Sequence, residues 1–183
     1  MSTQSNVTAG KPKTSGAIYR APKGTAVPTD ATTDLSQAFK DLGYVSEDGV
    51  TNETSRETET VRAWGGDTVL VTQTEFGDNF TMTLIEAKNV DVLKTVFGDS
   101  NVTVDANTSL ITVAVNSKEL EEAVYVIDQI YNGAVSRIVI PHGKITEIGE
   151  VEFTDDDAVG YETTISCMPD ANGNTHYQYI LNS

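Results

Sequence analysis

The chain has 183 residues, 38% hydrophobic and 21% charged, which are the values of one ordinary globular domain with a real core. It holds 12 lysines and arginines against 27 aspartates and glutamates, a net charge of −15. A groove for nucleic-acid phosphates needs clustered cations, so this balance argues against a nucleic-acid-binding protein. Cys167 is the only cysteine, which excludes an intrachain disulfide and a cysteine-based zinc site.

No stretch approaches the roughly 18 apolar residues of a membrane-spanning helix, and the N-terminus lacks the apolar region of a signal peptide. We therefore expect no membrane association and no secretion. Without a secretory route, the five Asn-x-Ser/Thr sequons are interpreted as threonine-rich strand sequence rather than glycan sites. They begin at Asn6, Asn52, Asn79, Asn101 and Asn107.

Residues 1–33 are rich in serine, threonine, alanine, glycine and proline and have no apolar periodicity, so we expect an extended N-terminal arm. Residues 1–29 carry four bases and no acid, whereas residues 30–183 have a net charge of −19. A basic arm on an acidic body predicts a strap that holds a neighbouring copy. The alternative is a terminus with no role.

Residues 34–183 are expected to form a single domain. It begins with a short helical turn over residues 34–42, which Asp34 caps and Gly43 ends. A polar, acidic loop over residues 42–54 is expected to follow.

The chain is organised around residues 56–87. We predict three consecutive strands here, joined by tight turns at residues 64–67 and 76–79, because glycines at bends between threonine, valine and aromatic residues are typical of hairpins. The last strand alternates an apolar face with a face of small hydroxylated residues, as a wall between a packed interior and water does. The apolar face holds Phe80, Met82 and Leu84.

One short helix is predicted over residues 90–97. Asn89 is placed to cap its start and Gly98 to end it. It has only about two turns, so it should depend on packing against the sheet.

The second half of the chain is again β, with Asn132-Gly133 as its strongest hairpin signal. Short strands separated by turns every eight to twelve or so residues indicate a sandwich or barrel. The predicted fold is therefore mainly β (α+β), an antiparallel β-sandwich or barrel with one flanking helix. The expected strands are residues 110–115, 123–131, 136–140, 144–153, 161–167 and 175–181.

Catalytic and cofactor motifs are absent: there is no G-x-G-x-x-G, Walker loop, G-x-S-x-G or H-E-x-x-H. His142 and His176 are interpreted as surface or hairpin-end residues, and Cys167 as a small buried hydrophobe. The acidic turn at residues 155–157 is expected to be solvated. The segment from Asp170 lacks the glycine and glutamate of a calcium loop. We predict no catalytic residue, no metal site, no cofactor and no enzymatic activity.

Trp64, the only tryptophan, stands at a predicted hairpin bend. A large aromatic side chain there predicts either an interface anchor or a plug folded back on its own sheet.

Four segments together resemble the major tail proteins, or tail tube proteins, of long-tailed siphophages. They are LGYVSEDGVTNETS (42–55), AWGGD (63–67), LIEAKNVDVLKTVFG (84–98) and IPHGKITEIGEVEFTDDDAVGYETTISCMPD (140–170). The resemblance implies subunits that close into hexameric rings, which stack into a tube for phage DNA in the virion tail, assembled in the host cytoplasm. It also implies tape measure, tail terminator and distal tail proteins as partners.

The residues themselves agree with this resemblance. Long, flat, threonine-rich strands are an aggregation hazard unless their edges are paired, and ring closure pairs them. A lumen with few cations would repel passing double-stranded DNA rather than bind it. The lumen-lining candidates are Thr72, Gln73, Thr74, Glu75, Thr81 and Thr83. The candidates for contacts between subunits or rings are Lys11, Lys13, Arg20, Lys23, Glu47, Asp48 and Trp64.

A competing interpretation is a monomeric β-sandwich, either a binding or adhesion module or a capsid decoration protein. It predicts a compact monomer at high concentration, where the tube interpretation predicts rings or tubes.

Overall fold

The structure is a computed structural model that describes residues 4, 7–13 and 17–181. Its main element is a nine-stranded antiparallel sheet in the order β3-β2-β8-β9-β10-β5-β4, with β1 also pairing β8 and β11 also pairing β9. These strands are β1 (Gly10–Pro12), β2 (Ile18–Pro22), β3 (Lys40–Asp41), β4 (Val45–Arg62), β5 (Thr68–Leu84), β8 (Ala123–Tyr131), β9 (Ala134–Ile148), β10 (Tyr161–Cys167) and β11 (Tyr177–Leu181). The strands β6 (Val102–Val104) and β7 (Ile111–Val113) pair separately.

The centre of the sheet is the β8–β9 hairpin, whose turn is the predicted Asn132-Gly133. Both turn residues have positive φ, 47° and 99°, the conformation that a two-residue hairpin turn requires. β9 is long enough to pair with β11 near its start and with β10 near its end. The predicted antiparallel, mainly β fold with one short helix is thus confirmed.

Both faces of the β8–β9 hairpin are buried. On one face Tyr125, Ile127 and Ile140 join the larger core, which β5, β10 and the helix α1 (Val90–Phe97) complete. On the other face Val124 and Val126 join a smaller core, which Phe39 helps to cover.

The helix α1 forms where the sequence predicts it. The side-chain oxygen of Asn89 accepts a hydrogen bond from the Asp91 amide at 3.0 Å, and Gly98 follows the helix with φ of 97°. Val92 and Val96 are fully buried, which fixes the helix to the larger core. No helix in the described part of the chain is long and apolar enough to cross a membrane.

Two predictions for residues 34–54 are wrong. Residues 34–42 form turns and the short strand β3 rather than a helix, because Phe39 and Leu42 are drawn into different cores. The predicted acidic loop at residues 42–54 is instead the first half of β4 from Val45 onwards. Pairing with β5 overrides the polar composition of this segment.

Two predicted strand breaks are also wrong. β5 runs without a turn through residues 76–79, and Gly77 pairs with Ser55 of β4. The two strands approach closely at Gly77, because an added Cβ would lie 2.5 Å from the Ser55 hydroxyl, which would have to rotate away. The strands predicted at residues 136–140 and 144–153 are one strand, β9, which ends at Ile148.

Within the predicted arm, β1 and β2 pair with β8 of the same chain. Ile18 is buried in the larger core and Ala21 in the smaller one. Residues 18–22 are thus part of the body, while the first residues, 1–3 and 5–6, lie outside the described range. The division of the chain at residue 33 stays a prediction.

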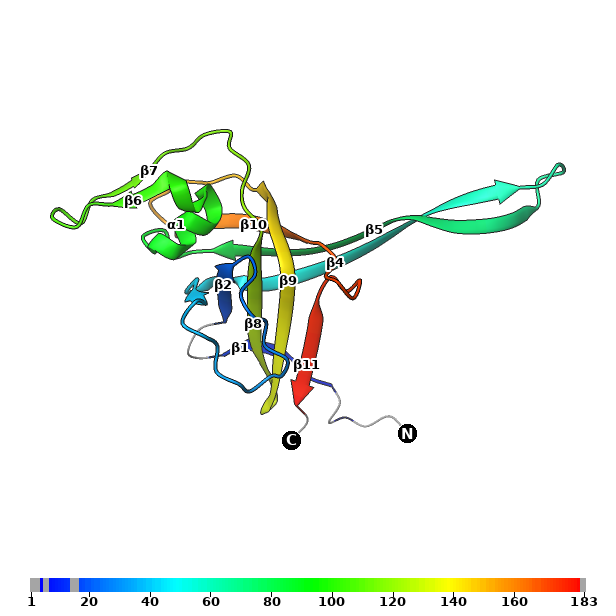
Figure 1. The fold of residues 1–183 in the computed structure, drawn as a ribbon, viewed down its shortest axis with the longest axis horizontal. Coiled ribbons are helices and arrows are strands. Elements are labelled where there is room, and N and C mark those ends of the chain that lie inside the picture. The colour runs from blue at the N-terminus through cyan, green and yellow to red at the C-terminus, as the bar shows by residue number, and fades with distance from the viewer. Residues whose placement is uncertain (1–3, 5–6, 14–16, 182–183) are drawn as a thin grey trace.

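The molecule is far from spherical. Figure 1 shows the β4–β5 hairpin leaving the body as a long ribbon, with the β6–β7 hairpin projecting on the opposite side. The outer part of β4–β5 has no other element beside it.

Candidate functional site

The projecting part of the β4–β5 hairpin is the most unusual surface of the chain. Every residue from 51 to 76 is exposed, on both faces of the ribbon. At about 3.3 Å per residue, the exposed stretch from Thr51 to Arg62 is roughly 40 Å long. A two-stranded ribbon is marginally stable at best in water, so this one calls for contacts beyond its own chain.

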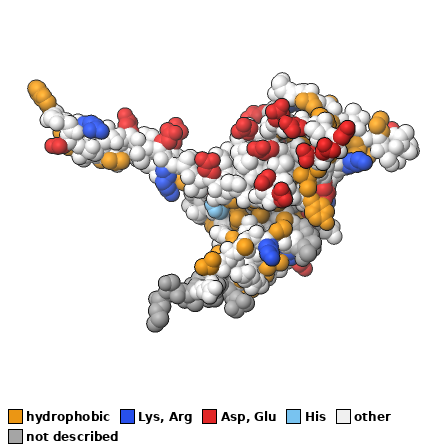
Figure 2. Space-filling model, turned by 180° about the vertical axis from the view of Figure 1, so that it is seen from behind, with side chains coloured by type: hydrophobic (Ala, Val, Ile, Leu, Met, Phe, Trp, Pro, Cys, Tyr) orange, Lys and Arg blue, Asp and Glu red, His pale blue; other side chains and the backbone are white. Residues whose placement is uncertain are grey.

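Most of the exposed large apolar side chains of this hairpin lie near its turn, with Phe76 closer to the body. Trp64 is fully exposed at the turn, so the structure excludes the plug and leaves the interface anchor. Figure 2 shows apolar side chains at the end and along the edge of the projecting hairpin. The large apolar side chains exposed on the hairpin are Val61, Trp64, Val69, Leu70, Val71 and Phe76.

The hairpin also has open backbone edges. Within the described residues, nothing pairs with the outer edge of β4 along its whole length. β10 pairs with β5 only over residues 79–84, so the edge of β5 is open from Thr68 onwards as far as Asp78. Unpaired amide and carbonyl groups in a row form a template for another strand.

A buried carboxylate fixes the root of the hairpin. Asp78 is 2% exposed, and its oxygens accept hydrogen bonds from Thr175 Oγ1 at 2.5 Å and Asn52 Nδ2 at 2.9 Å. His176 Nδ1 lies 2.6 Å from Asp78 Oδ2, and the imidazole stacks edge-on against Phe80. We call Asp78, Asn52, Thr175 and His176 the root cluster.

The root cluster changes the acidity of Asp78. Burial on its own raises the pKa of a carboxyl group, but hydrogen bonds from Thr175, His176 and Asn52 outweigh it and hold the pKa of Asp78 below its ordinary value. The carboxylate therefore stays charged and joins β5, β4 and the segment before β11 at neutral pH. The sequence gives no local signal for this cluster, since Asp78 and His176 lie 98 residues apart.

The six lumen-lining candidates lie along one strand, β5, but not on one face of it. Thr81, Thr83 and Glu75 share the face that turns away from the core residue Phe80. The pairing of β4 with β5 shifts by one residue between Glu57 and Thr58, so Thr72, which pairs with Glu59, also lies on this face. Gln73, which pairs with Thr58, lies on the opposite face, and Thr74 is the extra residue at the register shift. Thr81 and Thr83 are half-buried in the body.

Three of the four basic contact candidates already have acidic partners in their own chain. Arg20 pairs with Asp99 at 2.8 Å and Lys23 with Glu122 at 2.6 Å. Lys13 lies 3.6 Å from the buried Asp128. At these three positions the basic N-terminal residues thus pair with acids of their own chain.

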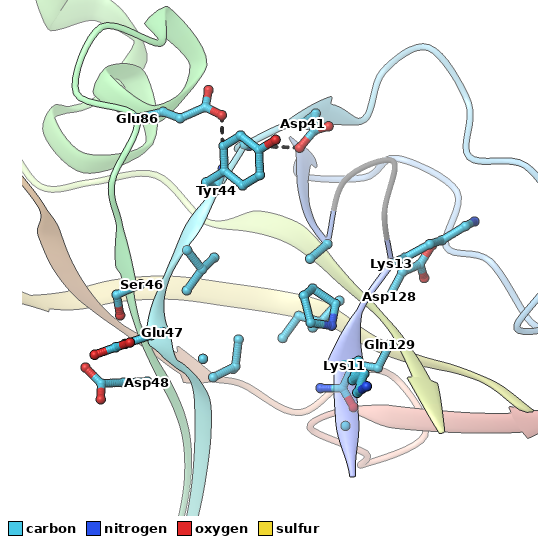
Figure 3. Close-up of a pocket in the computed structure, with 18 of the residues that line it drawn as sticks. Lys11, Lys13, Asp41, Tyr44, Ser46, Glu47, Asp48, Glu86, Asp128 and Gln129 are labelled. Atoms are coloured by element: carbon cyan, nitrogen blue, oxygen red, sulfur yellow. Dashed lines mark hydrogen bonds and ion pairs between the residues drawn. The ribbon is translucent and has the colours of Figure 1, made fainter. Parts of the chain in front are cut away.

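The remaining contact candidates apart from Trp64 lie around one groove of about 1000 Å³. It runs between β1, the end of β8 and the start of β4, and Lys11, Glu47 and Asp48 line it (Figure 3). No cluster of possible metal ligands is found among the residues that the structure describes.

Three potentially reactive side chains, Cys167, His176 and His142, each have a structural explanation for their surroundings. Burial and the nearby Asp78 charge raise the pKa of Cys167 to about 12, so this half-buried thiol stays protonated and unreactive. His176 belongs to the root cluster, whereas His142 lies 3.6 Å from Glu122.

Comparison with known proteins adds a sequence match over nearly the whole chain. A family model described as phage tail tube protein matches residues 2–183. No curated protein matches the sequence.

Among solved structures, the chain is similar to a chain of an extracellular contractile injection system, the PVC sheath–tube complex in its extended state. The TM-score is 0.48 and the identity 9%, over 99% of this chain and 100% of that one. It is also similar to a chain of the anti-feeding prophage cap, with a TM-score of 0.48, 8% identity and the same coverage.

Proposed function

Because the chain belongs to the phage tail tube protein family, we propose that its copies form hexameric rings that stack into the tail tube of a long-tailed siphophage. Family membership makes the chain a structural component of the virion tail rather than an enzyme. The number of copies per ring and the siphophage tail belong to the proposal, and both come from the resemblance of four sequence segments to that group.

The observation that carries the proposal is the incomplete hairpin. Within the described residues, β4 has a free edge along all 18 residues, and the ribbon from residue 51 to residue 76 has neither face covered. A neighbouring copy that adds a strand to this edge removes an aggregation hazard and stabilises the ribbon at once.

Ring closure follows from the asymmetry of this contact. A free edge that meets a different surface of the next copy forms a heterologous contact, and such contacts close into a ring when the rotation between copies allows it. Sheets joined in this way surround a channel.

In the proposed tube, the inner half of the hairpin lines the channel for double-stranded DNA. Residues 53–59 and 72–76 carry four glutamates and one arginine. A channel wall with this balance repels the phosphates of the duplex, so DNA slides past it without binding. The proposed lining residues remain Thr72, Gln73, Thr74 and Glu75, with Thr81 and Thr83 at the channel's margin.

Contacts between rings are assigned to the hairpin end with Trp64, to Glu47 and Asp48, and to the N-terminal residues. Tape measure, tail terminator and distal tail proteins are the proposed partners of the finished tube. We place its assembly in the host cytoplasm.

Negative-stain electron microscopy of concentrated protein, with light scattering followed over time, tests the proposal. We expect rings or tubes with a central channel and scattering that rises with concentration. A monomer that persists at high concentration would contradict the proposal and favour a monomeric binding module.

A further inference from the structure

We infer that the outer third of the β4–β5 hairpin, residues 60–71, is clamped on both faces in the tube, in a seam between two neighbouring copies of the chain. The inference rests on the proposed function, and it goes further by specifying how the hairpin docks. The inference excludes a hairpin that docks by one face only.

Strand alternation places apolar side chains on both faces of this segment. Val69 and Val71 lie on one face, where Val71 pairs with Thr60. Leu70 lies on the other face, directly opposite Val61. These four side chains are each about half exposed or more, at 48–61%. Docking on a single surface would leave one apolar pair in water.

Charge is divided between the two parts of the hairpin. The inner part, residues 53–59 and 72–76, holds Glu53, Arg56, Glu57, Glu59 and Glu75. The outer third holds only Arg62 and Asp67, which flank the turn. Because burying an unpaired charge is costly, the inner part suits a wet channel and the outer third suits a dry contact.

The groove of one chain is a poor receptor for this apolar ribbon. Of the residues that line it, seven are charged: Lys11, Lys13, Asp41, Glu47, Asp48, Glu86 and Asp128. A seam between two copies instead offers two surfaces, or walls, one for each face of the ribbon. A ring of identical copies has such seams at regular intervals. The chain also exposes apolar residues elsewhere that are available as walls, among them Val104, Leu110 and Val115 near β6 and β7.

Trp64 stands beyond the apolar pairs, at the very end of the ribbon. An exposed indole that becomes buried on assembly is the type of anchor that dominates protein interfaces. As the only tryptophan, it also reports its own burial through its fluorescence.

The first test compares the two faces. Leu70→Asn places an uncharged polar group on one face of the ribbon, and Val71→Asn places one on the other face. Thr72→Asn is the control on the face of Leu70, and Thr58→Asn is the control on the face of Val71; both controls lie in the charged part of the hairpin. Thr58 pairs with Gln73, on the face of Val71. We expect Leu70→Asn and Val71→Asn each to raise the concentration at which tubes form roughly tenfold, and the two controls to leave it unchanged.

The outcomes separate the alternatives. If only one of Leu70→Asn and Val71→Asn impairs assembly, the hairpin docks on one surface and the inference is overturned. If tubes form normally with both, and Trp64 emission stays that of a solvent-exposed indole, the hairpin is free in the tube. If the wild-type chain forms no rings or tubes, the proposed function fails, and this inference fails with it. Thermal melting of each monomer checks that the body is unchanged.

The second test identifies the walls. A chain with photo-crosslinking residues at both positions 70 and 71 is mixed with a large excess of wild-type chain, assembled and irradiated. We expect covalent trimers on a denaturing gel, because the two faces touch different copies. Covalent dimers alone would show that one copy supplies both walls, and would overturn the seam.

Discussion

Asp78 is the buried carboxylate at the root of the hairpin. It is buried where the ribbon leaves the body, and its carboxylate is held by Asn52 of β4 and by Thr175 and His176 of the segment before β11. Sequence reasoning missed it because the predicted turn at residues 76–79 placed Asp78 in water. Its partners become neighbours only through the tertiary fold, so no local pattern marks them.

We expect Asp78→Ala to destabilise the body by about 1–3 kcal/mol, because three donors lose their acceptor, and two of them, Thr175 and His176, are half-buried. Urea unfolding of the monomer measures the change. Asp155→Ala, in an exposed turn, is the matched control and should have little effect. Equal stability of Asp78→Ala and the wild type would show that the root cluster contributes nothing to the fold.

Asp78 also predicts a loss of stability in acid. Its folded-state pKa lies below the ordinary value, so its contribution is complete above the unfolded pKa of about 4 and is lost as the pH falls through the folded value. The stability difference between wild type and Asp78→Asn should therefore be full at pH 6 and shrink below about pH 4. A difference that grows in acid would contradict this assignment.

The buried pair Arg137–Asp128 is the second residue-scale feature. Arg137 donates from Nε and Nη2 to the two Asp128 oxygens at 2.7 and 2.9 Å, and from Nη1 to the Thr33 carbonyl at 2.7 Å. It thus ties the segment after β2 to the central hairpin.

Arg137→Met should cost about 3–5 kcal/mol, because it leaves the Asp128 charge buried. Adding Asp128→Leu should recover part of that loss, which a double-mutant cycle of urea unfolding measures. If the two losses simply add, the side chains are not coupled.

At the scale of elements, local signals were sufficient for some parts of the fold. Asn89 and Gly98 predict α1, and Asn132-Gly133 predicts the β8–β9 turn, because caps and tight turns act within a few residues. The uninterrupted β5 was not predicted, since Gly77 was interpreted as a bend. It is instead a site of close approach between strands, which depends on Ser55 of the partner strand.

The projecting hairpin should be dispensable for folding and necessary for assembly. Glu57 and Glu75 are paired directly, so an Asn-Gly turn can replace residues 58–74 between them. Since the removed residues are all exposed, we expect the thermal midpoint of the monomer to change little and tube formation to be lost. The monomer's melting curve is the control, and tubes formed by this variant would contradict the proposed role of the hairpin.

At the scale of the whole molecule, charge is expected to decide how fast DNA passes. In the proposed tube, the net charge of −15 and the glutamates of residues 53–59 and 72–76 would form a wall that repels a duplex with one negative charge per about 1.7 Å. Composition alone predicted this property. It did not predict which face of β5 turns inward, because that depends on how copies meet.

Glu75→Lys should leave tubes intact and slow genome delivery, since a lysine on the channel wall attracts the phosphates that slide past. Delivery kinetics of virions that carry the variant provide the measurement. Lys118→Glu, a charge change on an exposed residue outside the hairpin, serves as the control. Unchanged delivery with Glu75→Lys would argue against a position in the lumen.

Hydrogen exchange at the free edge of β4 measures most directly whether the copies complete one another's sheets. Amide hydrogen exchange of residues 51–62 compares the monomer with the assembled tube. We predict rapid exchange of the outward-pointing amides in the monomer and strong protection in the tube, because a neighbouring copy pairs with them. Exchange that is equally rapid in both states would contradict the account.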